Sequence, residues 1–294
     1  RFPDGSFIEY NLYWSAKSAE KLDKKDVARD LYAKVIEFYP YTFHGIRAKD
    51  RLHALGVKPK PFLLNQTPEG SSAAREKGRQ LGRPLSIREK FHYIRANELA
   101  KLGLTREARN EIGELQKTVR KNLTGVLWLS HLYHQAQGYA ESLRLLHLYK
   151  DFTTKPKERN LSPKFWKHFF PLAYKEAVLA YAKYRKVDPF FVNGIIRQES
   201  LFDSQALSPA GARGLMQIMP ATGKKLYPKT KLKKPFETDA LFDPDLNIRL
   251  GVKYVSQLNK RFGKNGMHIL ISYNAGPHVL KKWLKRFGHL SDQD

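Results

Sequence analysis

The sequence predicts a mainly α-helical protein with two domains. Its 294 residues are enough for two domains of ordinary size, and 41% hydrophobic with 12% aromatic residues indicates buried cores. Apolar residues recur at spacings of three and four along most of the chain, which is the period of an amphipathic helix. Strand-like alternation is missing. We place the boundary near residue 160, which gives a first domain over 1–160 and a second over 161–294.

The first domain is predicted to be a series of helical hairpins that follow a short amphipathic stretch at Trp14–Leu22. The hairpins pair Asp26–Phe38 with Phe43–Leu55, Ser86–Leu102 with Thr105–Lys121, and Leu123–Gln137 with Tyr139–Asp151. Thr105 and Glu107 are expected to cap their helix. Residues 58–84 are rich in Pro, Gly, Ser and charge, and predict a linker or long surface loop. Such hairpins are typical of an α-solenoid of the tetratricopeptide kind.

The second domain is predicted to be a helical bundle. Its expected helices are Leu172–Tyr184, a helix from Asp188 that carries Glu199, Thr222–Tyr227, a helix from Asp243 to near Gly263, His268–Tyr273 and Val279–Phe287. Pro171 is expected to break the segment before the first of these. Asp188 followed by Pro189 is typical of a helix start, with an N-cap and then a proline where no amide donor is lost.

Glu199 is the first candidate for chemistry. The apolar positions of its predicted helix are Val192, Ile195 and Ile196. Glu199 follows seven residues after Val192, and so lies on or beside the buried stripe, where a carboxylate is costly unless it is protonated or partnered. Burial raises the pKa of a carboxyl, as a general acid near neutral pH requires. The alternative is an edge charge paired with Arg197 or Lys183.

Four short motifs follow in order along the second domain. They are E-S-x-F at Glu199–Phe202, G-L-M-Q-I-M-P at Gly214–Pro220, N-I-R-L-G at Asn247–Gly251 and S-Y-N-A-G at Ser272–Gly276. Together they resemble the soluble lytic transglycosylases, which cleave peptidoglycan with a goose-type-lysozyme-like catalytic domain preceded by a helical superhelix. The resemblance is strong from about Phe165 to Phe287 and only architectural before that. It implies a lysozyme-like catalytic domain over 161–294.

The resemblance also implies a reaction. In the family, one glutamate protonates the oxygen between N-acetylmuramic acid and N-acetylglucosamine. The same residue then takes a proton from the muramic acid 6-hydroxyl, and that oxygen closes on C1 to give a 1,6-anhydro end without water. Glu199 matches this glutamate. The location implied is the bacterial periplasm or cell envelope. The chain begins at Arg1 without a signal-peptide pattern, and we expect a mature or trimmed form.

Five further residues match positions that bind substrate in the family: Ser208, Gln217, Met219, Tyr273 and Asn274. Ser208 is expected to orient substrate groups, Gln217 to donate to and accept from sugar, and Met219 to form an apolar wall. Tyr273 is expected to place its hydroxyl near Glu199. The alternatives are turn roles for Ser208 and Asn274, and core packing for Met219 and Tyr273. Asn247 and Gly251 are interpreted as structural, capping and packing a helix beneath the cleft.

Two other functions stay open at this stage. A lysozyme-type hydrolase of the same fold needs a second carboxylate, for which Asp203, Asp243 and Asp245 are candidates. A wall-binding scaffold needs no working site. The first domain either binds an extended partner or only supports the second domain.

The net charge of +25 indicates a polyanionic partner. We favour an acidic envelope polymer or a membrane surface over nucleic acid, because the cations are spread along the chain and no nucleic-acid-binding signature accompanies them. No metal-ligand spacing or nucleotide motif occurs, and the chain has no cysteine, so we expect no metal or cofactor. We expect a monomer.

Overall fold

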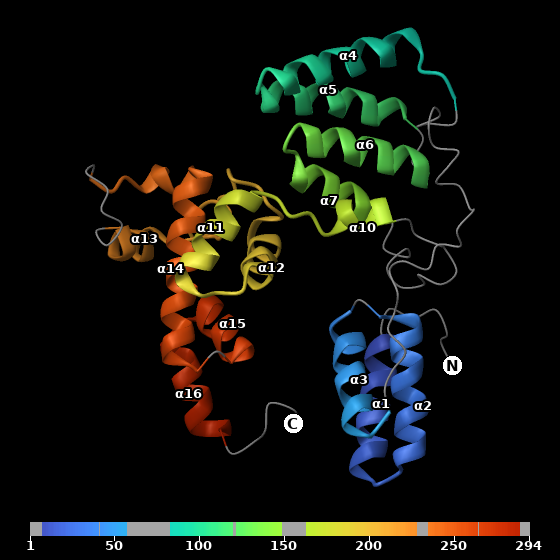
Figure 1. The fold of residues 1–294 in the computed structure, drawn as a ribbon, viewed down its shortest axis with the longest axis vertical. Helices are drawn as coiled ribbons and strands as arrows, with labels where there is room; N and C mark the ends of the chain where they lie inside the picture. The colour runs from blue at the N-terminus through green and yellow to red at the C-terminus, as the bar shows by residue number, and fades with distance from the viewer. Residues whose placement is uncertain are drawn as a thin grey trace. The chain divides into compact units, whose positions relative to one another are not determined.

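The computed structural model describes residues 8–40, 42–57, 83–119, 122–148, 163–227, 235–263 and 265–288. Within these ranges the regular elements are helices, which confirms the predicted mainly α fold (Figure 1). The chain divides into two compact units, unit 1 of Arg1–Ala136 with Glu141–Phe170 and unit 2 of Gln137–Ala140 with Pro171–Asp294. The boundary predicted near residue 160 lies outside the described residues, as does most of the loop predicted at 58–84.

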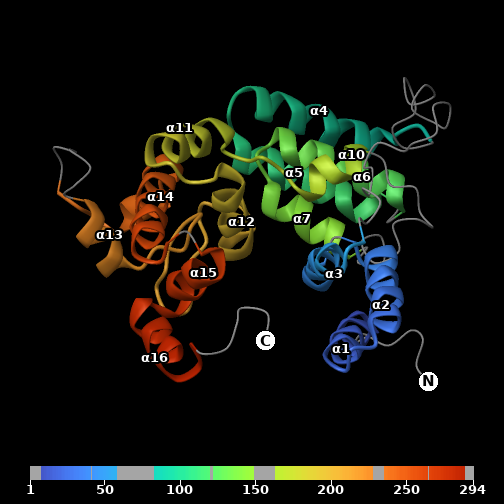
Figure 2. The ribbon, with the colours of Figure 1, turned by 60° about the horizontal axis from the view of Figure 1, so that its bottom comes forward.

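Unit 1 begins with three helices that share a core. They are α1 (Ile8–Lys21), α2 (Lys25–Phe38) and α3 (Phe43–Ala54). Tyr32 is fully buried in this core, and its hydroxyl donates to Glu20 at 2.9 Å. Arg51 of α3 pairs with the same half-buried carboxylate, which therefore joins all three helices. Figure 2 shows the three helices packed side by side.

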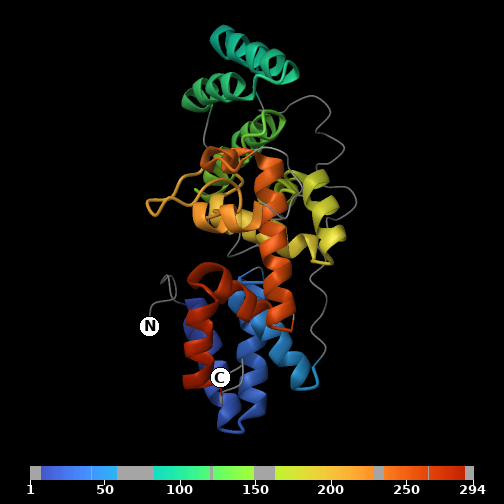
Figure 3. The same cartoon turned by 90° about the vertical axis from the view of Figure 1, so that its left-hand side faces the viewer.

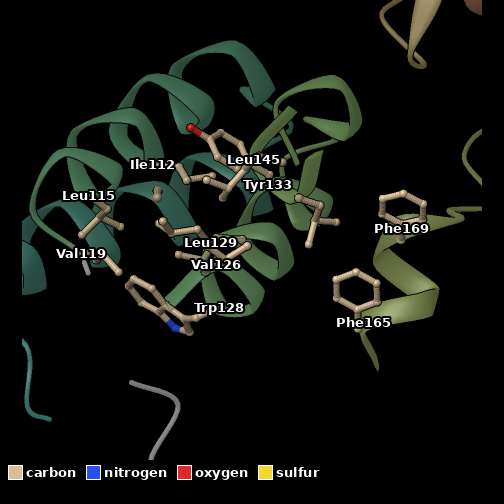
Figure 4. Packing of buried hydrophobic residues seen from close by; sticks show 14 of the residues in the cluster. Ile112, Leu115, Val119, Val126, Trp128, Leu129, Tyr133, Leu145, Phe165 and Phe169 are labelled. Carbon is tan, nitrogen blue, oxygen red and sulfur yellow. The ribbon is translucent and has the colours of Figure 1, made fainter. Parts of the chain in front are cut away.

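The rest of unit 1 is a second group of helices around its own core. These are α4 (Ile87–Lys101), α5 (Thr105–Thr118), α6 (Leu123–Gln135), α7 (Tyr139–His147) and α10 (Pro163–Phe169). Figure 4 shows Ile112 and Leu115 of α5 meeting Leu129 of α6, with Phe165 and Phe169 of α10 closing one side. The hairpins predicted from the sequence therefore form because each helix has one apolar face to bury.

The N-termini of α4 and α5 are capped differently. Ser86 and Glu89 form a complete capping box at the start of α4, where Ser86 accepts from the Glu89 amide at 3.2 Å. The prediction that Thr105 and Glu107 cap α5 is wrong. Leu104 occupies the N-cap position without a side-chain hydrogen bond. The reason is the short turn after α4, which closes through the Leu104 amide on the Leu99 carbonyl at 2.9 Å.

Unit 2 is built around one long helix. Its helices are α11 (Lys175–Arg185), α12 (Pro189–Ser200), α13 (Pro220–Leu226), η2 (Thr238–Phe242), α14 (Pro244–Arg261), α15 (Gly266–Ala275) and α16 (Pro277–Phe287). α14 packs against α11, α13, η2 and α15, and Figure 3 shows it running through the unit. Leu250, Val252 and Val255 are fully buried on it.

Some boundaries in unit 2 differ from those predicted. α11 begins at Lys175 and not Leu172, because Tyr174 takes a left-handed backbone conformation (φ 52°) just before it. α13 begins at Pro220, two residues before the predicted start, and the short η2 was not predicted. Asp243 caps α14 as expected, accepting from the Leu246 amide at 2.7 Å. In the described part of the chain, no helix is long and apolar enough to cross a membrane.

Candidate active site

α12 fixes the position of Glu199. The Asp188 carboxylate accepts from the Phe190 amide at 2.8 Å, and Pro189 occupies the first helical position. Three apolar side chains bury one face of the helix: Val192, Ile195 and Ile196. Glu199 lies in the last turn and is half-buried. The helix ends directly after it, because Leu201 takes a left-handed conformation with φ 51°.

The environment of Glu199 favours its protonated form. Burial raises the pKa of the Glu199 carboxyl above its ordinary value. Within the described ranges no hydrogen bond or ion pair holds this carboxylate, so the geometry does not support a pair with Arg197 or Lys183. A half-buried carboxyl with a raised pKa is suited to general acid catalysis.

A tight loop follows α12 and carries Ser208. Phe202, at its start, has φ 66° and is fully buried. The loop closes through two isolated β-bridges, which join Arg213 to Leu207 and to Ile218. The Ser208 hydroxyl accepts from the Ala212 amide at 3.0 Å. This contact is the turn role considered for Ser208, and it leaves the hydroxyl proton available to donate.

Gln217 is bound to the same loop. Its side-chain Nε2 donates to the Ala206 carbonyl at 3.1 Å and to the Gly214 carbonyl at 3.0 Å. These bonds use both amide hydrogens, so a sugar would meet Gln217 through its oxygen and not through the donor we expected. The residue has φ 45°, a strained value for a side chain of this size. Met219 follows with 42% of its surface exposed, so it is not packed into the core.

Asn247 holds the loop against α14. Its side chain is fully buried and satisfied by three backbone groups. Its Oδ1 accepts from the Met216 amide at 2.8 Å, and its Nδ2 donates to the Leu241 carbonyl at 2.7 Å and to the Arg213 carbonyl at 2.9 Å. Asn247 is thus structural, although it does not cap the helix. Asp243 does that.

Gly214 and Gly251 allow this loop to approach α14 closely. A Cβ on Gly214 would lie 2.3 Å from the Leu241 carbonyl oxygen, and Gly214 also has φ 73°. A Cβ on Gly251 would lie 2.2 Å from the Met216 sulfur. Each glycine is therefore required by contact with a neighbouring side chain or backbone.

Tyr273 of α15 lies beside Glu199 and the loop. Its hydroxyl donates to the Met216 carbonyl at 2.8 Å. Burial, and after it the negative charge of Glu199, raises the pKa of Tyr273, which keeps the phenol neutral. The structure therefore brings Glu199, Tyr273 and the segment with Gln217 and Met219 together.

The remaining predicted residues are Asn274 and the three candidates for a second carboxylate. Asn274 is exposed at the end of α15. Asp203 accepts from the Gln205 amide at 2.9 Å in a turn, and Asp245 accepts from the Tyr181 hydroxyl at 2.7 Å. With Asp243 at the N-cap of α14, each candidate second carboxylate has a structural partner. In the described ranges, no cluster of three His, Cys, Asp or Glu side chains is arranged to hold a metal.

Sequence reasoning missed two residues of this region. Ser200, next to Glu199, lies with its Oγ 2.8 Å from the Leu215 carbonyl oxygen and so ties α12 to the loop. Tyr254 of α14 packs its ring 5.4 Å from that of Tyr273. The contact between Tyr254 and Tyr273 could have been suspected from the sequence, because Tyr254 is a large aromatic residue on the helix that carries Asn247 and Gly251.

Part of the chain is similar to known proteins. Residues 176–294 match the family model of the transglycosylase SLT domain. The soluble lytic murein transglycosylase of Escherichia coli (strain K12) is 33% identical over 130 residues, which are 43% of this chain and 20% of that protein. The membrane-bound lytic murein transglycosylase E of Buchnera aphidicola (subsp. Acyrthosiphon pisum) is 32% identical over 116 residues, covering 37% and 52%.

A solved structure extends the similarity to most of the chain. The lytic transglycosylase Slt of Pseudomonas aeruginosa, solved as an inactive glutamate-to-glutamine mutant, has a TM-score of 0.65 and 26% identity, and covers 95% of this chain and 41% of that chain. The chain thus spans less than half of that protein.

Fold and site together define a protein with helical hairpins followed by a lysozyme-like helical domain. Residues 176–294 match the transglycosylase SLT domain family, and the resemblance to the soluble lytic transglycosylases is confirmed.

Proposed function

We propose that this protein is a peptidoglycan lytic transglycosylase. It cleaves the β-1,4 bond between N-acetylmuramic acid and N-acetylglucosamine and leaves a 1,6-anhydromuramic end. One observation carries the proposal: Glu199 is a half-buried carboxyl with a raised pKa and no hydrogen bond or ion pair in the described ranges. The SLT domain match and the names of the relatives support the same substrate class.

Glu199 acts twice in the proposed mechanism. Its proton passes to the bridging oxygen, the bond from that oxygen to C1 of the muramic acid breaks, and an oxocarbenium-like centre forms at C1. The resulting Glu199 carboxylate then removes the proton of the muramic acid 6-hydroxyl, and that oxygen bonds to C1. The proton ends on Glu199, so the site is reset without water.

The partners of the three candidate second carboxylates, all among the described residues, support transglycosylation over hydrolysis. An inverting hydrolase needs a second carboxylate across a water-sized gap. Asp203, Asp243 and Asp245 each bind a backbone amide or a tyrosine hydroxyl instead. In the proposed reaction the acceptor is the intramolecular 6-hydroxyl.

The residues around Glu199 are proposed to hold the sugar and tune the acid. Tyr273 is held by the Met216 carbonyl, and its neutral phenol provides a fixed dipole beside the glutamate. Gln217 offers its amide oxygen to a sugar hydroxyl, and Met219 offers an apolar wall to a ring face. Ser208 and Asn274 are proposed to bind polar groups of the substrate.

The test is digestion of purified peptidoglycan, with the products read by mass spectrometry. Wild-type protein is expected to release fragments whose muramic ends are lighter by one water than reducing ends. Glu199→Gln, which keeps the shape of the side chain but cannot donate a proton, is expected to release none while remaining folded. Reducing ends would overturn the transglycosylase reaction, and undiminished activity of Glu199→Gln would overturn the role of Glu199.

The place of action is proposed to be the bacterial envelope, where peptidoglycan lies. We propose that the helical hairpins of unit 1 bind intact glycan strands. Removal of residues 1–160 is then expected to weaken binding to intact wall more than cleavage of short soluble strands. Equal losses would leave unit 1 as a support for the second unit.

A further inference from the structure

Helix α16 (Pro277–Phe287) has an apolar face that its own unit covers only at one end. Leu280 is buried at 2% exposure, while Trp283, Leu284 and Phe287 are 50%, 39% and 48% exposed. These four residues fall at i, i+3, i+4 and i+7, so they form one continuous stripe along the helix. Figure 1 shows α16 at one end of unit 2, beyond α15.

The opposite face of α16 is cationic. Its exposed basic residues are Lys281, Lys282, Lys285 and Arg286. The helix contains no acidic residue, and none of the ion pairs found among the described residues involves these four cations. On a helical projection with 100° between residues, the four cations occupy one arc and the apolar stripe occupies the other.

We infer that α16 is an interfacial helix that binds the surface of an anionic lipid bilayer. A helix with Trp, Phe and Leu on one face and Lys and Arg on the other lies in the plane of the membrane interface. Its apolar stripe enters the boundary between headgroups and acyl chains, and its cations contact the acidic headgroups. Insertion into the bilayer explains why Trp283 and Phe287 are exposed to water in the free protein. Because α16 carries cations and no acidic residue, the surface that it binds is expected to be negatively charged.

A lipid surface fits these observations better than a wall polymer does. An acidic glycan would pair with the cations of α16, yet it offers no apolar volume for Leu284 beside two aromatic rings. Membrane association of this kind is reversible, because one short amphipathic helix buries little area. It would hold the second unit close to the membrane without a membrane-spanning segment.

The test is co-sedimentation of the whole chain with vesicles, without peptidoglycan. Vesicles of phosphatidylcholine alone are compared with vesicles that also contain anionic phosphatidylglycerol. Wild-type protein is expected to bind the anionic vesicles and to be released by salt, since each cation near such a surface raises the partition coefficient about five-fold. Because no glycan is present, the result does not depend on the proposed enzymatic activity.

Two variants of α16 separate the apolar from the charged contribution. Trp283→Gln with Phe287→Gln is expected to weaken binding at least about ten-fold by removing the inserted side chains. Lys282→Gln with Arg286→Gln is expected to weaken it about 25-fold. Both pairs are exposed, so the fold is expected to persist, which circular dichroism checks.

Matched controls in the same unit decide whether α16 itself is responsible. Lys224→Gln with Lys225→Gln removes the same net charge from exposed positions on α13, and Phe190→Gln removes a ring that is 68% exposed. Both are expected to bind nearly as well as wild type. Equal weakening by the α13 pair would mean diffuse charge attraction and would overturn the inference.

Two further results would also overturn the inference. One is that the protein does not bind anionic vesicles but binds insoluble peptidoglycan, and that this binding depends on Trp283. The apolar stripe would then be a contact for sugar rings. The other is a dimer dissociated by Trp283→Gln with Phe287→Gln, which would assign the stripe to a second copy of the chain.

Discussion

Replacement of Asn247 by alanine is expected both to destabilise unit 2 and to lower the activity of the candidate site. Among the described residues, and apart from bonds within helices, Asn247 is the only partner of the Met216 amide and of the Leu241 carbonyl, and the change removes it. The Arg213 carbonyl keeps the Ile218 amide at 3.0 Å and is not left unpaired. Two buried polar groups without partners cost about 1–3 kcal/mol each, so we expect a loss of about 2–6 kcal/mol.

Such a loss is large against the stability of an ordinary domain, about 5–15 kcal/mol. It is expected to be accompanied by loss of activity beyond the loss of folded protein, because Met216 carries both the amide held by Asn247 and the carbonyl held by Tyr273. Native-state hydrogen exchange at the buried amides of α14 measures the free energy of opening for unit 2 separately from unit 1.

Asn259→Ala is the matched control. Asn259 lies on the same helix and is half-buried, and the structure records no side-chain hydrogen bond for it among the described residues. Its replacement is expected to change stability by less than about 0.5 kcal/mol. If Asn247→Ala costs under about 1 kcal/mol, or if both variants cost the same, the reasoning from buried hydrogen bonds is refuted.

Three other predictions rest on single contacts. Tyr273→Phe loses the bond to the Met216 carbonyl, and is expected to lower the rate of glycan release more than thermal stability; an unchanged rate would leave Tyr273 as packing. Gly251→Ala places a Cβ against the Met216 sulfur and is expected to lower the unfolding temperature measured by calorimetry. An unchanged unfolding temperature would contradict this prediction. The hydrogen bond from Arg83 lowers the pKa of Glu89 to about 2, so its stabilisation is present above pH 4.5 and is lost as pH falls toward 2. Glu89→Gln is therefore expected to be less stable than wild type at neutral pH but not near pH 2, and a gap that persists in acid would contradict this.

The sequence by itself determined the helical class and most helix positions, and it indicated Glu199 as the candidate acid. Helical spacing predicted α2 within one residue at its start, and the Asp–Pro pairs located the starts of α12 and α14, because caps and prolines act locally. The order of the four motifs along the second domain was enough to indicate the domain family. Local rules failed for α5, where a short hairpin turn and not a threonine decided how the helix begins.

Only the tertiary structure decided how the site is held together. Gln217 and Tyr273 are 56 positions apart in sequence, and both depend on the loop around Met216. That loop is locked by Asn247 from yet another helix. Spacing along a chain cannot show that both Gln217 donors are used by backbone carbonyls, or that three candidate carboxylates already have partners. Hydrogen bonds and burial between distant segments are properties of the folded chain, and they determine which polar groups remain for chemistry.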